Sequence, residues 1–232
     1  MIVLEANKIS YLDQLRESSF VLHEGFTTLM GPSGSGKSTC AQLLIGALGL
    51  SSGEVNYFSG TGDTILQIGP PSKKGLFGRL RLESDHNRQI KKHIIQYCGY
   101  VAQNPELPKD MTVGDYIYNV RTAASNKLDT DYVEWLLETL GIAKNIDSIA
   151  TRQSGGEQQR TAIAFALANR PSLLIADEPN ASLDTASSKE VIELTRSMAN
   201  NGMSVLWITH TPAHQDYADH KLFAKDGIVQ VA

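Results

Sequence analysis

Apolar and polar residues follow two different patterns along this chain. Leu173–Ala176 and Ser204–Ile208 are short apolar runs, which is typical of strands covered on both faces. From Asp131 to Leu140 the apolar residues instead recur three and four positions apart, which predicts a helix that ends at Gly141. Strand-like runs separated by helical segments predict an α/β fold with a mostly parallel sheet.

The same patterns extend over the whole chain and predict one domain, residues 1–232. The expected strands are Ile2–Ala6, Ser19–Leu22, Phe26–Met30, Val55–Phe58, Ile94–Val101, Leu173–Ala176, Ser204–Ile208 and a closing hairpin of Leu222–Ala224 with Ile228–Val231. The expected helices are Lys37–Leu48, Val113–Ala123, Asp131–Leu140, Gly156–Asn169 and Val191–Met198. We expect a core of residues 1–103 and 166–232, with a helical subdomain over residues 104–165.

Composition narrows the class of protein. Of the 232 residues 41% are hydrophobic, so the chain can bury a sizeable core and is not expected to be disordered. A formal net charge of −4 argues against nucleic acid as a partner. Cys40 and Cys98 fit no metal-ligand spacing and are expected to be small buried hydrophobes. No signal peptide or membrane-length apolar stretch is apparent, so we expect a cytoplasmic protein that reaches a membrane only through a partner.

A glycine-rich segment carries the clearest chemical signal. It lies between an apolar run and a helical stretch and consists of Gly31, Pro32, Ser33, Gly34, Ser35, Gly36, Lys37, Ser38 and Thr39. This pattern, G-x-x-x-x-G-K-S, is that of a phosphate-binding loop, whose backbone N–H groups converge on phosphate oxygens at a helix N-terminus. Lys37 can reach the β- and γ-phosphates, and Ser38 can supply a hydroxyl for Mg²⁺. Alone, the loop predicts only a protein that binds nucleotide phosphates.

Two carboxylates follow the apolar strand Leu173–Ala176 directly. Asp177 and Glu178 are therefore expected at the carboxyl edge of the sheet, where open α/β sheets bind ligands. Asp177 would hold Mg²⁺ through water, and Glu178 would accept a proton from a water that attacks the γ-phosphate, or orient that water. The alternative is a solvated acidic turn before Pro179.

A second candidate anion site lies at residues 153–160, which read Gln-Ser-Gly-Gly-Glu-Gln-Gln-Arg. Ser154 can cap a helix, and Gly155 and Gly156 leave its first amides bare, so this helix N-terminus can also receive an anion. The alternative is a capped helix that faces no ligand.

The phosphate-binding loop and the Ser-Gly-Gly segment upstream of Asp177-Glu178 resemble the motifs of ABC-type ATPases and occur in the same order. The resemblance covers essentially the whole chain. The resemblance implies a P-loop NTPase fold of ABC type: a mostly parallel core sheet, an antiparallel β subdomain and an α-helical signature subdomain. It implies ATP and Mg²⁺ as ligands. It also implies that Ser154, Gly155, Gly156 and Glu157 face the γ-phosphate held by the phosphate loop of a second cassette, in a homodimer or a heterodimer.

The resemblance assigns further roles by position. His210, after the strand Val205–Thr209, matches the histidine that contacts the γ-phosphate, although a histidine at a strand end is usually a hydrogen-bonded structural residue. Gln103 matches the glutamine that touches Mg²⁺ and the attacking water, and its loop would couple nucleotide state to a partner. Asp184, in Ser182-Leu183-Asp184, matches the loop that bridges the two sites.

Tyr11 is a further candidate, because an aromatic ring there could stack on adenine. Its alternative is a tyrosine that only fills apolar surface.

The sequence also indicates a branch of the family. Glu157 and the sequence Ile175–Pro179 are similar to the corresponding positions of ABC cassettes that serve lipoprotein release, macrolide export and cell division. Three features depart from that pattern: Gln153 replaces the usual leucine, Phe165 replaces a frequent arginine, and the segment between Val55 and Gln103 is longer. Substrate and direction of transport do not follow from these residues.

Two functions remain open at this point. The leading one is the ATPase subunit of a transporter that drives a separate membrane permease. The alternative is an ATP-gated regulatory or mechanical-signalling cassette that acts on a non-transport partner. The basic stretch from Lys73 to His93 could contact the membrane or a permease loop, or could be a solvated variable loop.

Overall fold

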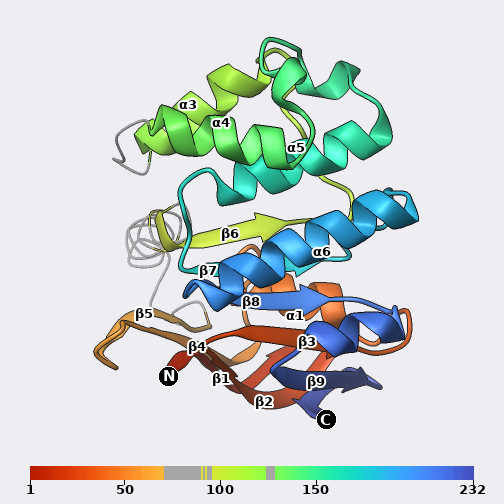
Figure 1. Cartoon of the computed structure of the whole chain (residues 1–232). Coiled ribbons are helices and arrows are strands. Elements are labelled where there is room, and N and C mark those ends of the chain that lie inside the picture. The colour runs from red at the N-terminus through yellow and green to blue at the C-terminus, as the bar shows by residue number, and fades with distance from the viewer. Residues whose placement is uncertain (71–89, 91, 93–95, 124–128) are drawn as a thin grey trace.

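The computed structural model describes residues 1–70, 90, 92, 96–123 and 129–232 (Figure 1). Its strands are β1 (Ile2–Tyr11), β2 (Leu15–His23), β3 (Phe26–Met30), β4 (Ser52–Phe58), β5 (Thr64–Ile68), β6 (Cys98–Val101), β7 (Leu173–Asp177), β8 (Ser204–Ile208), β9 (His220–Lys225) and β10 (Ile228–Val231). Its α-helices are α1 (Lys37–Leu44), α3 (Val113–Ala123), α4 (Thr130–Thr139), α5 (Gly155–Leu167) and α6 (Thr185–Asn200). Short 3₁₀ turns lie at Ala143–Asn145, Ala150–Arg152 and Pro212–Tyr217.

A six-stranded sheet in the order β10-β9-β3-β8-β7-β6 forms the centre of the molecule (Figure 1). All neighbouring strands in it are parallel except β10, which returns antiparallel to β9. The prediction of a mostly parallel α/β sheet closed by a C-terminal hairpin is therefore confirmed.

The register of the central strands brings their carboxyl ends into line. Leu29 of β3 pairs with Ile208 of β8, and Ile208 pairs with Asp177 of β7. Every residue of β7 and β8 is buried, as their apolar runs predict. The loops that leave β3, β7 and β8 consequently start side by side at one edge of the sheet.

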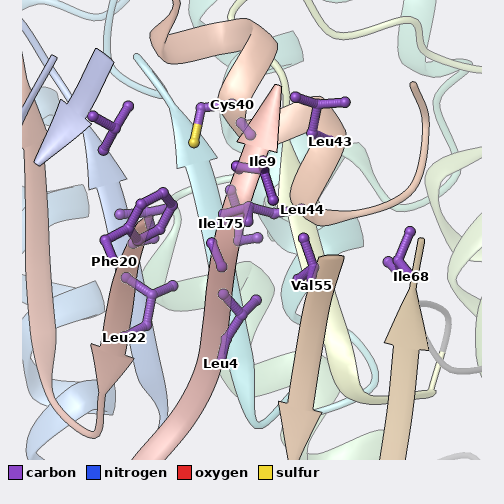
Figure 2. Packing of buried hydrophobic residues seen from close by; sticks show 14 of the residues in the cluster. Leu4, Ile9, Phe20, Leu22, Cys40, Leu43, Leu44, Val55, Ile68 and Ile175 are labelled. Atoms are coloured by element: carbon purple, nitrogen blue, oxygen red, sulfur yellow. The ribbon is translucent and has the colours of Figure 1, made fainter. Parts of the chain in front are cut away.

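A second sheet, antiparallel and four-stranded, has the order β2-β1-β4-β5 and covers one side of the molecule. Figure 2 shows Leu4, Phe20, Leu22 and Val55 of this sheet meeting Leu44 of α1 in one apolar layer. All five side chains are at most 4% exposed. The helix that begins at the phosphate-binding motif is thus fixed between the two sheets.

The other face of the parallel sheet packs against helices. Alternate residues of β7 and β8, including Leu174 and Trp207, point into a second core formed with α3, α4, α5 and α6. Phe26 lies beside Trp207 with ring centroids 5.8 Å apart. In Figure 1 the helices α3, α4 and α5 form a layer at one end, beyond β6. The proposed division into core and helical subdomain is compatible with this arrangement and stays a prediction.

The structure corrects several element boundaries. The strand expected from Ile94 begins only at Cys98, because Gln96 and Tyr97 are helical. A short apolar run does not distinguish helix from strand, which explains the error. The helix expected from Lys37 to Leu48 ends at Leu44 in the structure.

Two features of the antiparallel sheet were not predicted at their full extent. The first two strands were expected to be four or five residues long but span 10 and 9 residues. Strand β5 was not predicted at all, because Thr64, Ile65 and Gln67 are exposed and leave only a weak alternating pattern.

Two observations concern how the chain could contact a membrane. No α-helix within the described ranges combines the length and the apolar character that crossing a bilayer requires. The basic stretch Lys73–His93 lies outside the described residues, apart from Ile90 and Lys92.

The packing between the sheets predicts a specific stability difference. Leu22 is 1% exposed, and Leu22→Ala should lower the free energy of unfolding by about 2–5 kcal/mol, because it removes buried methyl groups and leaves a cavity. The same change at Leu12, which is 69% exposed, should cost less than about 0.5 kcal/mol. Urea unfolding of both variants tests this, and equal losses would contradict the packing in Figure 2.

Candidate functional site

The phosphate-binding motif forms the loop between β3 and α1. Gly31 has φ 155°, and a Cβ there would lie 2.1 Å from the carbonyl oxygen of Ala224, so only glycine fits without moving the backbone. Gly34 has φ 76°, and no atom of the described residues lies within 4 Å of the place of a Cβ. The loop therefore packs tightly against β9 at its start and faces open space at its tip, as a cradle for phosphate requires.

Lys37, the first residue of α1, is 6% exposed and turns back over this loop. Its Nζ donates hydrogen bonds to the carbonyl oxygens of Gly31 and Pro32, each at 2.9 Å. These two acceptors hold the ammonium at the cradle, where a phosphate oxygen can serve as a further partner.

Asp177 ends β7 and is 2% exposed. Burial is the main cause that raises the pKa of Asp177, and the charge of Glu178 adds to it, whereas a hydrogen bond from Ser38 and the charge of Lys37 lower it. Its Oδ1 has no hydrogen-bond partner among the described residues. A buried carboxylate oxygen without a partner, next to a serine hydroxyl, fits a Mg²⁺ ion and its coordinated waters.

Glu178 lies between two other predicted residues. Its Oε2 accepts a hydrogen bond from Gln103 Nε2 at 3.0 Å, and its Oε1 lies 3.2 Å from His210 Nδ1. The Glu178 side chain is 15% exposed, whereas that of His210 is 67% exposed. Glu178 also has φ 46°, a strained conformation for a residue with a side chain, and its N–H donates to the carbonyl oxygen of Ile208.

Lys37, Ser38, Gln103, Glu178 and His210 line one polar hollow of about 950 Å³, whereas the buried Asp177 is not part of its lining. Its lining is formed by Asp13, Gln14, Arg16, Ser33, Gly34, Gly36, Lys37, Ser38, Thr39, Gln103, Glu178, His210, Asp226 and Gly227. Four separate loops thus bring the phosphate-binding motif, Glu178, Gln103 and His210 together. This arrangement does not fit a solvated acidic turn at Glu178.

Part of the hollow comes from residues that the sequence did not single out. Thr39 Oγ1 donates to Gln14 Oε1 at 3.2 Å, and the N–H of Arg16 donates to the carbonyl oxygen of Gly227 at 2.7 Å. The β1–β2 and β9–β10 turns therefore meet beside the loop. No motif marks these turns, because only the pairing of distant strands brings them to the site.

Tyr11 is not brought into that lining. It ends β1, pairs with Leu15 and packs, partly buried, against the core between the sheets. Asp13, Gln14 and Arg16, which follow it closely in the chain, do line the hollow, and the stacking of Tyr11 on adenine stays a prediction.

Ser154 caps α5, as expected. Its Oγ accepts from the N–H of Glu157 at 3.4 Å, and the N–H of Ser154 donates to Glu157 Oε2 at 3.1 Å, which completes a capping box. Hydrogen bonds from Ser154, followed by one from Asn145, lower the pKa of Glu157 to about 2. Glu157 also lies 3.7 Å from Lys144 Nζ.

The helix start at Ser154 lies beside the loop that precedes α6. A Cβ on Gly156 would be 3.7 Å from both the carbonyl oxygen of Ser182 and a methyl group of Leu183. Asp184 caps α6 and accepts from the N–H groups of Ala186 and Ser187, each at 3.0 Å. Ser154, Gly155, Gly156, Glu157 and Asp184 are all absent from the lining of the polar hollow, so within one chain they form a separate surface.

The two unusual residues near this surface have clear partners. Gln153 Oε1 accepts a hydrogen bond from the buried Thr161 at 2.7 Å. The ring of Phe165 lies 4.2 Å from that of Tyr116. Both departures from the family pattern are therefore integrated into the helical layer.

The family model described as "ABC transporter" matches residues 15–181. The chain belongs to the ABC transporter family. It is 32% identical over 228 residues to a hemin import ATP-binding protein HrtA of Staphylococcus epidermidis, covering 96% of this chain and 93% of that protein. It is 31% identical over 221 residues to the lipoprotein-releasing system protein LolD 1 of Chlorobium luteolum, covering 94% and 88%.

A third relative, the cell division ATP-binding protein FtsE of Mycobacterium tuberculosis, is 34% identical over 191 residues, with 80% of this chain and 72% of that protein covered. The predicted branch of the ABC family is thereby confirmed. A solved dimeric structure of the bacterial ABC transporter cassette MJ0796 has a TM-score of 0.79 at 21% identity, covering 98% of this chain and 96% of that one. The predicted fold class is confirmed as well.

The environment of Lys37 in this ABC protein leads to a binding prediction. At a hundredfold excess of Mg-ATP over Kd, nucleotide should stabilise the parent by about 2.7 kcal/mol, or about 5–10 °C in Tm. Lys37→Ala should lose most of that gain, because no ammonium remains to balance the phosphates. Lys189→Ala, whose side chain is 68% exposed, is the control and should keep the full gain. Differential scanning calorimetry decides, and an equal gain in Lys37→Ala would place the phosphates elsewhere.

Proposed function

We propose that this chain is the ATP-binding and ATP-hydrolysing subunit of an ABC transporter, which dimerises on ATP and drives a separate membrane permease. The observation that carries the proposal is the contact of Glu178 with both Gln103 and His210, in the same hollow as the phosphate-binding loop. A carboxylate held this way, in one hollow with the Lys37 ammonium and the glycine-rich loop, fits phosphoryl transfer to water.

The phosphate-binding loop would hold the nucleotide. Its amides and Lys37 contact the phosphates, while Ser38, Asp177 and Gln103 are the side chains that would hold Mg²⁺ and its waters. Mg²⁺, when bound, neutralises charge on the β- and γ-phosphates. The lack of a hydrogen-bond partner for Asp177 Oδ1 in the described part of the chain supports this assignment.

Glu178 would act as the general base. A water oxygen attacks the γ-phosphorus, its proton passes to a carboxylate oxygen of Glu178, and the bond from the γ-phosphorus to the bridging oxygen of ADP breaks. Gln103 orients the attacking water, and His210 donates a hydrogen bond to the γ-phosphate. Both side chains already contact Glu178, so small movements suffice to exchange these partners.

A second cassette would complete the site. Ser154, Gly155, Gly156 and Glu157 begin α5 on a surface that the polar hollow of the same chain does not include. A second copy, or a related cassette, could present the same surface to the γ-phosphate, with Asp184 beside it. The dimeric structure of MJ0796 supports this assembly by its fold.

Coupling to a permease would run through the loop after Gln103. A second hollow of about 740 Å³ is lined by residues 98–102 and 104–107, and also by Tyr116 and Phe165. A permease segment bound there would contact the chain directly next to Gln103, so it could sense whether Gln103 engages nucleotide. The relatives named for hemin import and lipoprotein release support transport. In this role the protein is cytoplasmic and lies at the inner face of the cell membrane.

The second candidate is an ATP-gated regulatory cassette. The likeness to FtsE, which is named for cell division, favours it. Both candidates require the same nucleotide chemistry, and they differ in the partner bound at the second hollow.

Removal of the base gives the first test of this mechanism. Glu178→Gln should lower the ATPase kcat by about 10²–10⁴, because the amide cannot accept the proton. Affinity for ATP should remain, so the variant should accumulate as an ATP-bound dimer in gel filtration. Glu193→Gln, an exposed change on α6, should hydrolyse ATP at the parental rate. Parental turnover by Glu178→Gln would refute the assignment.

The composite site is tested at Ser154. Ser154→Arg should block the approach of a second cassette by bulk and charge, while nucleotide binding to the monomer persists. Ser154→Ala separates this effect from loss of the helix cap, which costs about 1 kcal/mol of stability, and should still dimerise. Both changes are made in the Glu178→Gln protein and followed by light scattering with ATP. Normal dimerisation of Ser154→Arg would remove Ser154 from the composite site.

A further inference from the structure

A buried chain of polar groups connects the loop after β7 with the loop after β8. Its centre is His214, in the 3₁₀ turn Pro212–Tyr217, which is 7% exposed and touches the Trp207 ring edge-on with centroids 6.1 Å apart. None of the sequence motifs includes His214, and the polar hollow does not include it either.

Both ring nitrogens of His214 have partners. Nδ1 lies 2.8 Å from Thr209 Oγ1, and Nε2 lies 3.3 Å from Asn180 Nδ2. Asn180 Nδ2 also donates to Ser188 Oγ at 2.6 Å, and Thr209 Oγ1 accepts from the N–H of Thr211 at 3.0 Å.

These partners determine the protonation of the ring. An amide nitrogen only donates, so His214 Nε2 must accept from Asn180 and carries no proton. His214 Nδ1 then carries the proton and donates it to Thr209 Oγ1. Burial first, and the charge of nearby His210 second, lower the pKa of His214, which favours this neutral form.

The two ends of this network of polar groups are next to the proposed catalytic residues. Asn180 follows Glu178 by two positions, in the loop that begins with the strained φ of 46°. Thr209 precedes His210 and Thr211 follows it, so the network holds the backbone on both sides of that exposed side chain. His214 is thus the bridge between the loop of Glu178 and the loop of His210.

We propose that His214 is a positioning residue, which keeps His210 and Glu178 in register by joining Thr209 to Asn180. The proposal rests on the catalytic roles given to His210 and Glu178 under the proposed function. Because His214 does not line the polar hollow, it acts on the geometry of hydrolysis and leaves the binding of ATP to the phosphate loop unaffected. Misplacement of reacting groups by about 1 Å can cost about 10²-fold in rate.

Two isosteric changes separate the arms of the bridge. In His214→Asn the amide Nδ2 can replace imidazole Nδ1 toward Thr209, but nothing reaches Asn180. In His214→Gln the amide oxygen can replace Nε2 as acceptor from Asn180, but the bond to Thr209 is lost. Asn180→Ala removes the bond between Asn180 and His214 without changing His214 itself. Because Asn180 is partly exposed, this variant guards against a His214 variant that fails to fold.

The experiment measures kcat and KM for ATP in the full chain, with Tm as the check of folding. His214→Asn, His214→Gln and Asn180→Ala should each lower kcat about ten- to hundredfold with KM changed less than about twofold. Parental kcat in the folded variants would overturn the proposal, and so would a loss confined to Tm.

A second arm asks whether His214 acts through His210. Phosphate release is followed in single turnovers with excess enzyme, so that slow rates can be measured. In a His210→Ala protein, His214→Gln, which lacks the bond to Thr209, should cause no further loss beyond about twofold, since neighbours that act as a unit are not additive. A full additional loss would mean that His214 acts otherwise. Parental turnover in His210→Ala itself would instead refute the proposed role of His210.

Discussion

The parallel register of β3, β8 and β7 is the constraint from which the candidate site follows. Leu29, Ile208 and Asp177 lie in one row across these strands. Since parallel strands end at the same edge, the phosphate-binding loop, His210 and Glu178 must emerge together there. A shift of one residue in this register would turn every side chain of β7 to the opposite face and separate Asp177 from Ser38. Packing of the sheet and chemistry of the site are therefore determined by the same pairing.

The buried strands also divide the molecule into two cores. Ile175 and Ile208 face the layer between the sheets, whereas Leu174 and Trp207 face the helices. The first core anchors α1 and with it the phosphate loop, and the second anchors α5, which begins at Ser154. If a dimer joins the phosphate loop of one chain to the helix start at Ser154 of another, its formation depends on how these two separately packed cores are positioned relative to each other. Both cores pack against the central parallel sheet, one on each face.

Much of this could be predicted from the sequence, because the informative residues are contiguous. The phosphate-binding segment, the carboxylates after an apolar strand and the serine cap at Ser154 each act within a few positions of the chain. Residues that meet only through folding could not be found: Gln14 and Arg16 arrive through the pairing of β1 with β2, and β5 is too weakly patterned to recognise. Tyr11 is partly buried against the core between the sheets, at the end of a strand whose following turn lines the hollow, and its stacking on adenine stays a prediction.

The polar groups of the site are held in different ways, and the difference bears on how it works. Lys37 and Glu178 have partners that nucleotide and water can replace, namely two loop carbonyls, Gln103 and His210. Asp177 keeps a buried oxygen without a partner among the described residues, so a cation gains an interaction there without displacing one. The contacts of His214 are buried away from the hollow and need not change when ligand enters. In the proposed mechanism, nucleotide and water would replace the exchangeable contacts, and the His214 bridge behind them would keep the loops of Glu178 and His210 in register while these two side chains change partners.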